Sequence, residues 1–126
     1  MVARPVIAVV DDEESVRLAL ARMLRASLYE VTVFGSGEEF LHSLRTSQPD
    51  CVVLDFQMPG LTGRDVLRAL TLAKLRLPII IVTAHDQPTL REKTLADGAI
   101  AYLAKPLRRE NLVAAIDAAI RRHAAS

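Results

Sequence analysis

The sequence is short of cysteine and of long apolar runs, and each shortage excludes a class of protein. The single cysteine, Cys51, excludes an internal disulfide and a metal site built from several thiolates, and it suits a reducing cytoplasm. The apolar run at 6–10 is followed at once by four acidic residues, so it is too short for a signal-peptide core or a membrane span. We therefore expect a cytoplasmic protein that does not enter the membrane.

The sequence also lacks an excess of charge of either sign. With 16 basic and 15 acidic residues its net charge is +1, which does not fit a general polyanion binder. No base-reading motif or basic arm accompanies the charges, so we expect no direct contact with nucleic acid. Residues 1–63 carry a net charge of −4 and residues 64–126 one of +5. This asymmetry is either surface scatter or an early acidic pocket with a late basic face.

Short apolar runs alternate with segments of helical spacing along the 126 residues, a length that suits one domain with one hydrophobic core. The apolar runs predict strands at 6–10, 30–34, 51–54, 79–82 and 100–103. Apolar spacing predicts helices around 16–24, from 36 or 37 to 44, from 63 to 70, over 88–97 and around 112–120. Ser36 with Glu39 predicts a capping box, and Gly98 predicts a helix end.

Five strand–helix alternations predict an α/β fold, a doubly wound (βα)5 sandwich. Its parallel five-stranded sheet is covered on both faces. Right-handed crossovers favour the flavodoxin-like strand order 2-1-3-4-5. In such a sheet, ligands bind beyond the carboxyl ends of the strands, where the order switches between strands one and three.

Polar residues follow four of the predicted strands at this ligand-binding edge. They are Asp11 and Asp12 after the first strand, Asp55 after the third, Thr83 after the fourth and Lys105 after the fifth. A single Asp after a strand is usually a turn former or a helix cap. Four segments that deliver polar groups to one edge are better explained by a functional site.

Three carboxylates at one edge repel each other and need compensation. Two unit charges about 4 Å apart cost about 4 kcal/mol at an effective dielectric near 20. Either one carboxyl stays protonated or cations neutralise the group, and Lys105 supplies one fixed charge. The remaining charge indicates a divalent metal, and all-oxygen ligands with room for phosphate favour Mg²⁺.

A carboxylate beside Mg²⁺, a hydroxyl and a lysine is also a phosphoryl-transfer site. Asp55, on the central strand between the acidic pair and Lys105, is the expected nucleophile and would become an acyl phosphate. Lys105 would offset charge on the transferring group, and Thr83 would hydrogen-bond one of its oxygens. The sequence has no GxxxxGK[ST] phosphate loop and no evident Cys/His nucleophile pair.

Taken together, these segments resemble a two-component response-regulator receiver domain of the CheY-like superfamily. The resemblance covers nearly the whole chain and rests on four motifs in order: Val9-Val10-Asp11-Asp12-Glu13, Leu54-Asp55-Phe56-Gln57-Met58-Pro59-Gly60, Ile81-Val82-Thr83-Ala84 and Ala101-Tyr102-Leu103-Ala104-Lys105-Pro106. The resemblance implies that residues 1–126 form a receiver domain with no output domain. It implies a phosphorylation-dependent signalling switch that catalyses only its own phosphorylation and dephosphorylation.

The resemblance also assigns a metal and a phosphodonor. Asp55 would accept phosphate from a histidine kinase or a histidine phosphotransfer protein, with Mg²⁺ as cofactor. Asp12 and Asp55 would ligate Mg²⁺, Asp11 would help through water, and the backbone carbonyl of Gln57 would be a further protein ligand. Thr83 and Lys105 would bind the phosphoryl group.

Two further pairs of residues receive roles from the resemblance. Thr83 and Tyr102 would form the switch that remodels the last helix–strand–helix face. Gln57 and His85 would tune the lifetime of the acyl phosphate. Each role has an alternative: Tyr102 could be half-buried packing on an edge strand, His85 a solvated loop residue and Gln57 a space filler. Cys51 is expected to be inert core.

The segment 88–122 is where the family would bind a downstream partner or dimerise, although its basic residues could simply be the solvated faces of two helices. A phosphorelay intermediate is an alternative reading of the whole chain. An aspartyl-phosphate phosphohydrolase is less favoured, because such an enzyme has a second Asp two residues after the nucleophile, and Gln57 stands there. A flavodoxin-like nucleotide-binding module is disfavoured by acidic residues where a phosphate loop would be.

Overall fold

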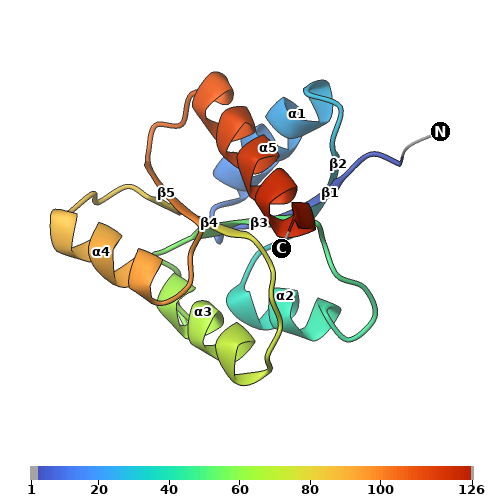
Figure 1. Cartoon of the computed structure of the whole chain (residues 1–126). Coiled ribbons are helices and arrows are strands. Elements are labelled where there is room, and N and C mark those ends of the chain that lie inside the picture. Colours follow the sequence, from blue (N-terminus) through green and yellow to red (C-terminus); the bar gives the residue numbers. More distant parts are fainter. Residues whose placement is uncertain (1–2, 126) are drawn as a thin grey trace.

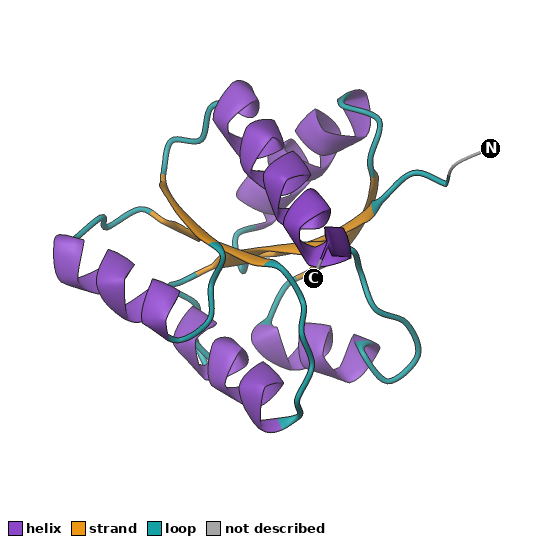
Figure 2. Ribbon diagram, viewed as in Figure 1, coloured by secondary structure: helices purple, strands orange, loops and turns teal. Residues whose placement is uncertain are grey.

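A computed structural model describes residues 3–125 as a three-layer α/β sandwich (Figures 1 and 2). Residues 1, 2 and 126 of the expected 1–126 domain lie outside the described residues. The strands are β1 (Val6–Val10), β2 (Glu30–Phe34), β3 (Cys51–Asp55), β4 (Ile79–Thr83) and β5 (Ala101–Ala104). The helices are α1 (Glu14–Ala26), α2 (Gly37–Ser43), α3 (Gly63–Leu72), α4 (Pro88–Ala96) and α5 (Arg109–Ala125).

The five strands form one parallel sheet in the order β2-β1-β3-β4-β5. β1 pairs with both β2 and β3, in a register that places Val10 beside Phe34 on one side and Leu54 on the other. The predicted fold class and strand order are therefore confirmed. Among the described residues, no helix is both long and apolar enough to cross a bilayer.

Helices cover both faces of the sheet: α1 and α5 lie on one face, and α2, α3 and α4 on the other (Figure 1). Alternate residues of each central strand point to opposite faces, which separates two apolar clusters. On the α1–α5 face, Val9 and Val53 pack with Leu20 and Ile116. On the opposite face the cluster contains strand residues together with Phe40, Val66 and Leu70. Both faces of the central strands must be apolar, which explains their unbroken Val/Ile runs.

The strand ends differ slightly from the sequence expectation. β3 includes Asp55 and β4 includes Thr83, so both polar residues belong to the last position of a buried strand. β5 lies one residue later than predicted, because the Lys105 N–H still donates to the Thr83 carbonyl at 2.7 Å. The edge strand β2 alternates only in part: Thr32 and Val33 are both exposed, since no strand lies beyond it.

Of the two predicted helix ends, one is confirmed and one is modified, and the structure contains a further helix cap that was not predicted. Gly98 has φ +111° just after α4, the left-handed conformation expected at a helix end. Ser36 Oγ accepts from the Glu39 N–H at 3.1 Å, but the Glu39 carboxylate accepts from the Gly35 N–H instead of that of Ser36, so only half of the capping box forms. The complete box belongs to Thr62 and Asp65 at the start of α3.

Candidate functional site

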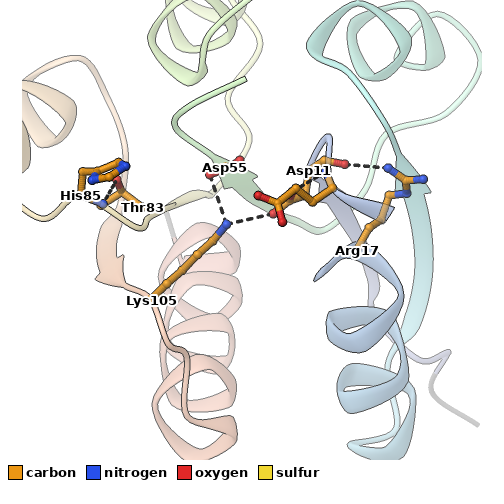
Figure 3. Close-up of polar contacts among 7 residues, drawn as sticks. Asp11, Arg17, Asp55, Thr83, His85 and Lys105 are labelled. Atoms are coloured by element: carbon orange, nitrogen blue, oxygen red, sulfur yellow. Dashed lines mark hydrogen bonds and ion pairs between the residues drawn. The ribbon is translucent and has the colours of Figure 1, made fainter. Parts of the chain in front are cut away.

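Four of the predicted site residues, Asp11, Asp55, Thr83 and Lys105, meet at the carboxyl edge of the sheet (Figure 3). Asp11 and Asp12 directly follow β1, Asp55 and Thr83 end β3 and β4, and Lys105 directly follows β5. The β1–β3 register pairs Val10 with Leu54, so the next residues, Asp11 and Asp55, become neighbours across the switch in strand order. The topology therefore brings together residues that are up to 94 positions apart in the sequence.

Three carboxylates form an acidic cluster at this edge. One carboxylate oxygen from each of Asp11, Asp12 and Asp55 lies within 4.8 Å of the others. Asp11 and Asp55 are buried, whereas Asp12 is exposed. Carboxylate oxygens with open access on one side fit a hard divalent cation such as Mg²⁺, which keeps several of its waters.

Lys105 links two of these carboxylates. Its Nζ lies 3.2 Å from Asp11 Oδ2 and 3.4 Å from Asp55 Oδ1, and its side chain is 19% exposed. Burial alone would lower the pKa of Lys105, but the Asp55 and Asp11 carboxylates outweigh it and raise this pKa. The ammonium group is therefore a fixed positive charge in the site.

The Asp55 carboxyl group has a raised pKa. Burial and the neighbouring Asp11 carboxylate raise the pKa of Asp55 to about 6, although Lys105 and the Gln57 backbone N–H act in the opposite direction. A raised pKa means that the ionised carboxylate is held at a cost in free energy. A bound cation would relieve that cost, because it favours the ionised form.

Asp11 is held by hydrogen bonds to its N–H, its carboxylate and its carbonyl. Its N–H donates to the Phe34 carbonyl at 3.1 Å, and its Oδ1 accepts from the Glu13 N–H at 2.9 Å. Its own carbonyl accepts from Arg17 Nη1 at 2.8 Å (Figure 3). Sequence reasoning did not identify Arg17, because nothing in a helical arginine shows that its partner is a backbone carbonyl in the preceding loop.

Thr83 and His85 lie on the other side of Asp55 from Arg17 (Figure 3). Thr83 is fully buried, and its Oγ1 accepts from the His85 N–H at 3.1 Å. This bond uses the hydroxyl oxygen as acceptor and leaves its proton available to donate. His85 and Gln57, two residues past Thr83 and Asp55 respectively, are both exposed.

Gly63 lets the start of α3 approach the segment that follows Asp55. A Cβ at this position would lie 2.8 Å from the Phe56 Cα and 3.1 Å from the Asp55 carbonyl oxygen. The Gly63 N–H also donates to the Phe56 carbonyl at 2.9 Å. The backbone of Phe56, directly after Asp55, is thus held by close packing.

Tyr102 is buried, with 3% of its surface exposed, although β5 is an edge strand. Half-buried packing, the alternative to a switch role, does not describe this residue, because α4 packs against β5 and covers it. The Arg91 guanidinium carbon lies 5.5 Å from the centre of the Tyr102 ring. The Tyr102 hydroxyl is buried and forms no hydrogen bond of ordinary geometry among the described residues, although the Gln87 N–H and the Asp86 carboxylate lie close enough to influence it. Burial raises the pKa of Tyr102.

The late segment 88–122 spans α4, β5 and most of α5. Of its apolar residues, Leu95 is 41% exposed, whereas Leu90, Ile100 and Leu107 are partly buried against the core. Cys51 is a buried free thiol, and burial raises its pKa to about 12, as expected of inert core.

Comparison with known protein families matches residues 7–117 to the response regulator receiver domain. The chain belongs to this family. Receiver domains are switches of two-component signalling rather than conventional enzymes, and they interact with histidine kinases and effector domains. The family generally binds Mg²⁺ at an Asp cluster, and the cluster of Asp11, Asp12 and Asp55 stands at the corresponding edge of this domain.

Curated relatives and solved structures agree with this assignment. The receiver domain is 41% identical over 116 residues to the response regulator MprA of Mycolicibacterium vanbaalenii and 34% identical over 119 residues to nodulation protein W of Bradyrhizobium diazoefficiens. These matches cover 92% and 94% of this chain but 50% and 52% of those relatives, so the chain spans about half their length.

Two solved receiver structures superpose closely on the domain. The Francisella response regulator 1452 receiver domain has a TM-score of 0.90 at 27% identity, covering 95% of this chain and 99% of that one. The structure of FixJ-N has a TM-score of 0.88 at 30% identity, covering 95% of this chain and 96% of the other.

Proposed function

We propose that this receiver domain is a phosphorylation-dependent switch in which Asp55 accepts a phosphoryl group from the phosphohistidine of a histidine kinase or a histidine phosphotransfer protein. The observation that carries the proposal is the position of Lys105, within 3.4 Å of the buried Asp55 carboxylate and within 3.2 Å of Asp11. A lysine shared by two carboxylates at the ligand-binding edge of the sheet suits a site that receives further negative charge.

Mg²⁺ fits the acidic cluster as the cofactor of this step. Asp12, Asp55 and the Gln57 backbone carbonyl would hold the ion, with Asp11 acting through water. Bound there, the cation would offset negative charge on the transferring phosphoryl group.

The residues of the chain perform the transfer itself. An Asp55 carboxylate oxygen attacks phosphorus, the phosphorus–nitrogen bond to the donor imidazole breaks, and an acyl phosphate forms. The Lys105 ammonium offsets charge on the phosphoryl oxygens, and the Thr83 hydroxyl donates to one of them. Gln57 and His85, exposed beside Asp55, control the access of water and so the lifetime of the acyl phosphate.

The output of the switch is a change at the face formed by α4, β5 and α5. Thr83 moves toward the phosphoryl group, and Tyr102 changes its position in response. The Tyr102 hydroxyl supports this role: it is buried and forms no hydrogen bond of ordinary geometry among residues 3–125, and such a polar group gains by finding a better position. A protein partner or a second copy would read the change through the 88–122 region.

Residues 1–126 act as one receiver unit in the cytoplasm under this proposal. A phosphorelay intermediate uses the same chemistry, and it differs only in passing the phosphoryl group on to another histidine. Adding an acceptor histidine phosphotransfer protein to the phosphorylated domain separates the two roles, since only an intermediate would transfer the group onward.

The direct test is incubation with acetyl phosphate and Mg²⁺, with and without a chelator, followed by intact-mass measurement. We expect a metal-dependent gain of one phosphoryl group in the native protein and none in Asp55→Asn. Asp12→Asn should lose most of the gain by losing the cation. Phosphorylation of Asp55→Asn to the native extent would reject Asp55 as the acceptor.

A further inference from the structure

Arg17, in the second turn of α1, reaches back over the loop between β1 and α1. Its Nη1 donates to the Asp11 carbonyl at 2.8 Å, and its side chain is half-buried (Figure 3). A charged donor to a carbonyl is among the stronger hydrogen bonds in a protein. This contact fixes the peptide unit that joins Asp11 to Asp12.

Asp12 has no comparable support of its own. Its side chain is exposed and forms no hydrogen bond or ion pair within residues 3–125. The direction of its carboxylate therefore depends on the backbone that carries it. Asp11, in contrast, is held through its N–H, its carboxylate and its carbonyl, and the carbonyl bond is the one nearest to the Asp12 peptide.

We propose that Arg17 is a positioning residue for the metal site, acting through the Asp11 carbonyl to orient the Asp12 carboxylate. This inference rests on the proposed function, in which Asp12 is a direct ligand of Mg²⁺. Residues that orient a metal ligand from outside the site commonly affect metal affinity by 10-fold to 100-fold.

The charge of Arg17 and its positioning role have opposite effects on the affinity for Mg²⁺. A guanidinium near the cluster repels an incoming cation, so removing only that charge would tighten Mg²⁺ binding. Loss of positioning would weaken it. The sign of the change in affinity therefore distinguishes a positioning residue from a mere neighbouring charge.

Gly35 offers a way to disturb the same contact without changing any charge. A Cβ at Gly35 would lie 3.2 Å from Arg17 Nη1 and 3.8 Å from its Cζ. The flexible guanidinium would have to shift by a few tenths of an ångström, which would lengthen its bond to the Asp11 carbonyl. Gly35→Ala is thus an independent variant that tests position alone.

The experiment measures the Mg²⁺ dissociation constant by calorimetry in the full chain. We expect binding about 10-fold weaker in Arg17→Gln, a smaller loss in Arg17→Lys and a loss of about 2-fold to 3-fold in Gly35→Ala. Arg22→Gln is the matched control: Arg22 lies on α1, is exposed, and forms no hydrogen bond or ion pair within the described residues. This control should bind Mg²⁺ as the native protein does.

Amide hydrogen exchange in metal-free protein gives a second readout. The Asp11 and Glu13 amides, both hydrogen-bonded in this loop, should exchange faster in Arg17→Gln while those of β3 stay protected. Unchanged exchange in the loop, or Mg²⁺ binding as tight as native or tighter in Arg17→Gln, would overturn the inference. Absence of Mg²⁺ binding in the native protein would instead refute the proposed metal site, and the exchange data would still decide whether Arg17 holds the loop.

Discussion

The Lys105 ammonium lies between the carboxylates of Asp11 and Asp55, at 3.2 and 3.4 Å (Figure 3). The two acids come from neighbouring strands and the lysine from the far end of the sheet, so only the folded topology creates this triad. One cation facing two buried carboxylates leaves negative charge uncompensated. The predicted properties of the site follow from that imbalance.

Asp55→Asn should stabilise the metal-free protein at neutral pH. The folded pKa of Asp55, about 6, exceeds its ordinary value of 3.8, so the native protein loses stability as pH rises from about 4 through about 6. Below pH 4 the group is protonated in both states and this loss is absent. We expect the advantage of Asp55→Asn to grow by about 2 to 3 kcal/mol between pH 4 and pH 7.5.

Urea unfolding in the presence of a chelator, at several pH values, measures this difference. The pH dependence is the informative quantity, because any constant effect of the new amide cancels from it. A stability difference that stays the same from pH 4 to pH 7.5 would contradict the raised pKa. Glu92→Gln is the control, because Glu92 on α4 is exposed and forms no hydrogen bond or ion pair within the described residues.

Lys105→Gln should destabilise the metal-free protein while tightening its hold on Mg²⁺. Without the ammonium, two buried carboxylates repel each other with no compensating charge, at a cost of about 1 to 3 kcal/mol near neutral pH. The same loss removes a cation that competes for Asp55, so Mg²⁺ should bind more strongly. Unfolding with chelator and calorimetry with Mg²⁺ report the two effects, and weaker Mg²⁺ binding would count against the competition.

Sequence reasoning could predict the fold because the physical signals are local and repeated. The unbroken apolar runs of β1, β3 and β4 mark strands buried on both faces, and each is followed by helical spacing. Since parallel strands point the same way, the residues after them must share one edge, which predicts where Asp55, Thr83 and Lys105 lie.

Contacts that depend on side-chain direction could not be predicted in this way. The bond from Arg17 to the Asp11 carbonyl needs the angle at which α1 leaves the loop, and the burial of Tyr102 needs the position of α4. The capping box of Thr62 and Asp65 could have been recognised, because a Thr with an acidic residue three positions later is its usual pattern. The roles of the site residues in catalysis remain predictions.

Thr62→Ala should destabilise the domain by about 1 kcal/mol through loss of the α3 cap. Thr62 Oγ1 accepts from the Asp65 N–H at 3.2 Å, and the Asp65 carboxylate accepts from the Thr62 N–H at 3.0 Å. Thr62→Ser keeps the hydroxyl and should retain most of the stability. Chemical denaturation compares the variants, with Thr89→Ala as the control, because Thr89 is exposed and its side chain forms no hydrogen bond within the described residues.

Tyr29→Phe and Tyr102→Phe should change stability in different ways, although each removes one hydroxyl from a buried tyrosine. The Tyr29 hydroxyl donates to the Asp117 carboxylate, and burial together with that contact raises the pKa of Tyr29. Its removal should cost about 1 kcal/mol. The Tyr102 hydroxyl forms no hydrogen bond of ordinary geometry within residues 3–125, although the Asp86 carboxylate and the Gln87 N–H lie near it, so Tyr102→Phe should match the native protein or exceed it by up to about 1 kcal/mol. Denaturation of both variants in the presence of a chelator measures the two stability changes. If Tyr102→Phe loses as much stability as Tyr29→Phe, the Tyr102 hydroxyl is hydrogen-bonded in solution. That result would remove the argument that the Tyr102 hydroxyl is free to act in the switch.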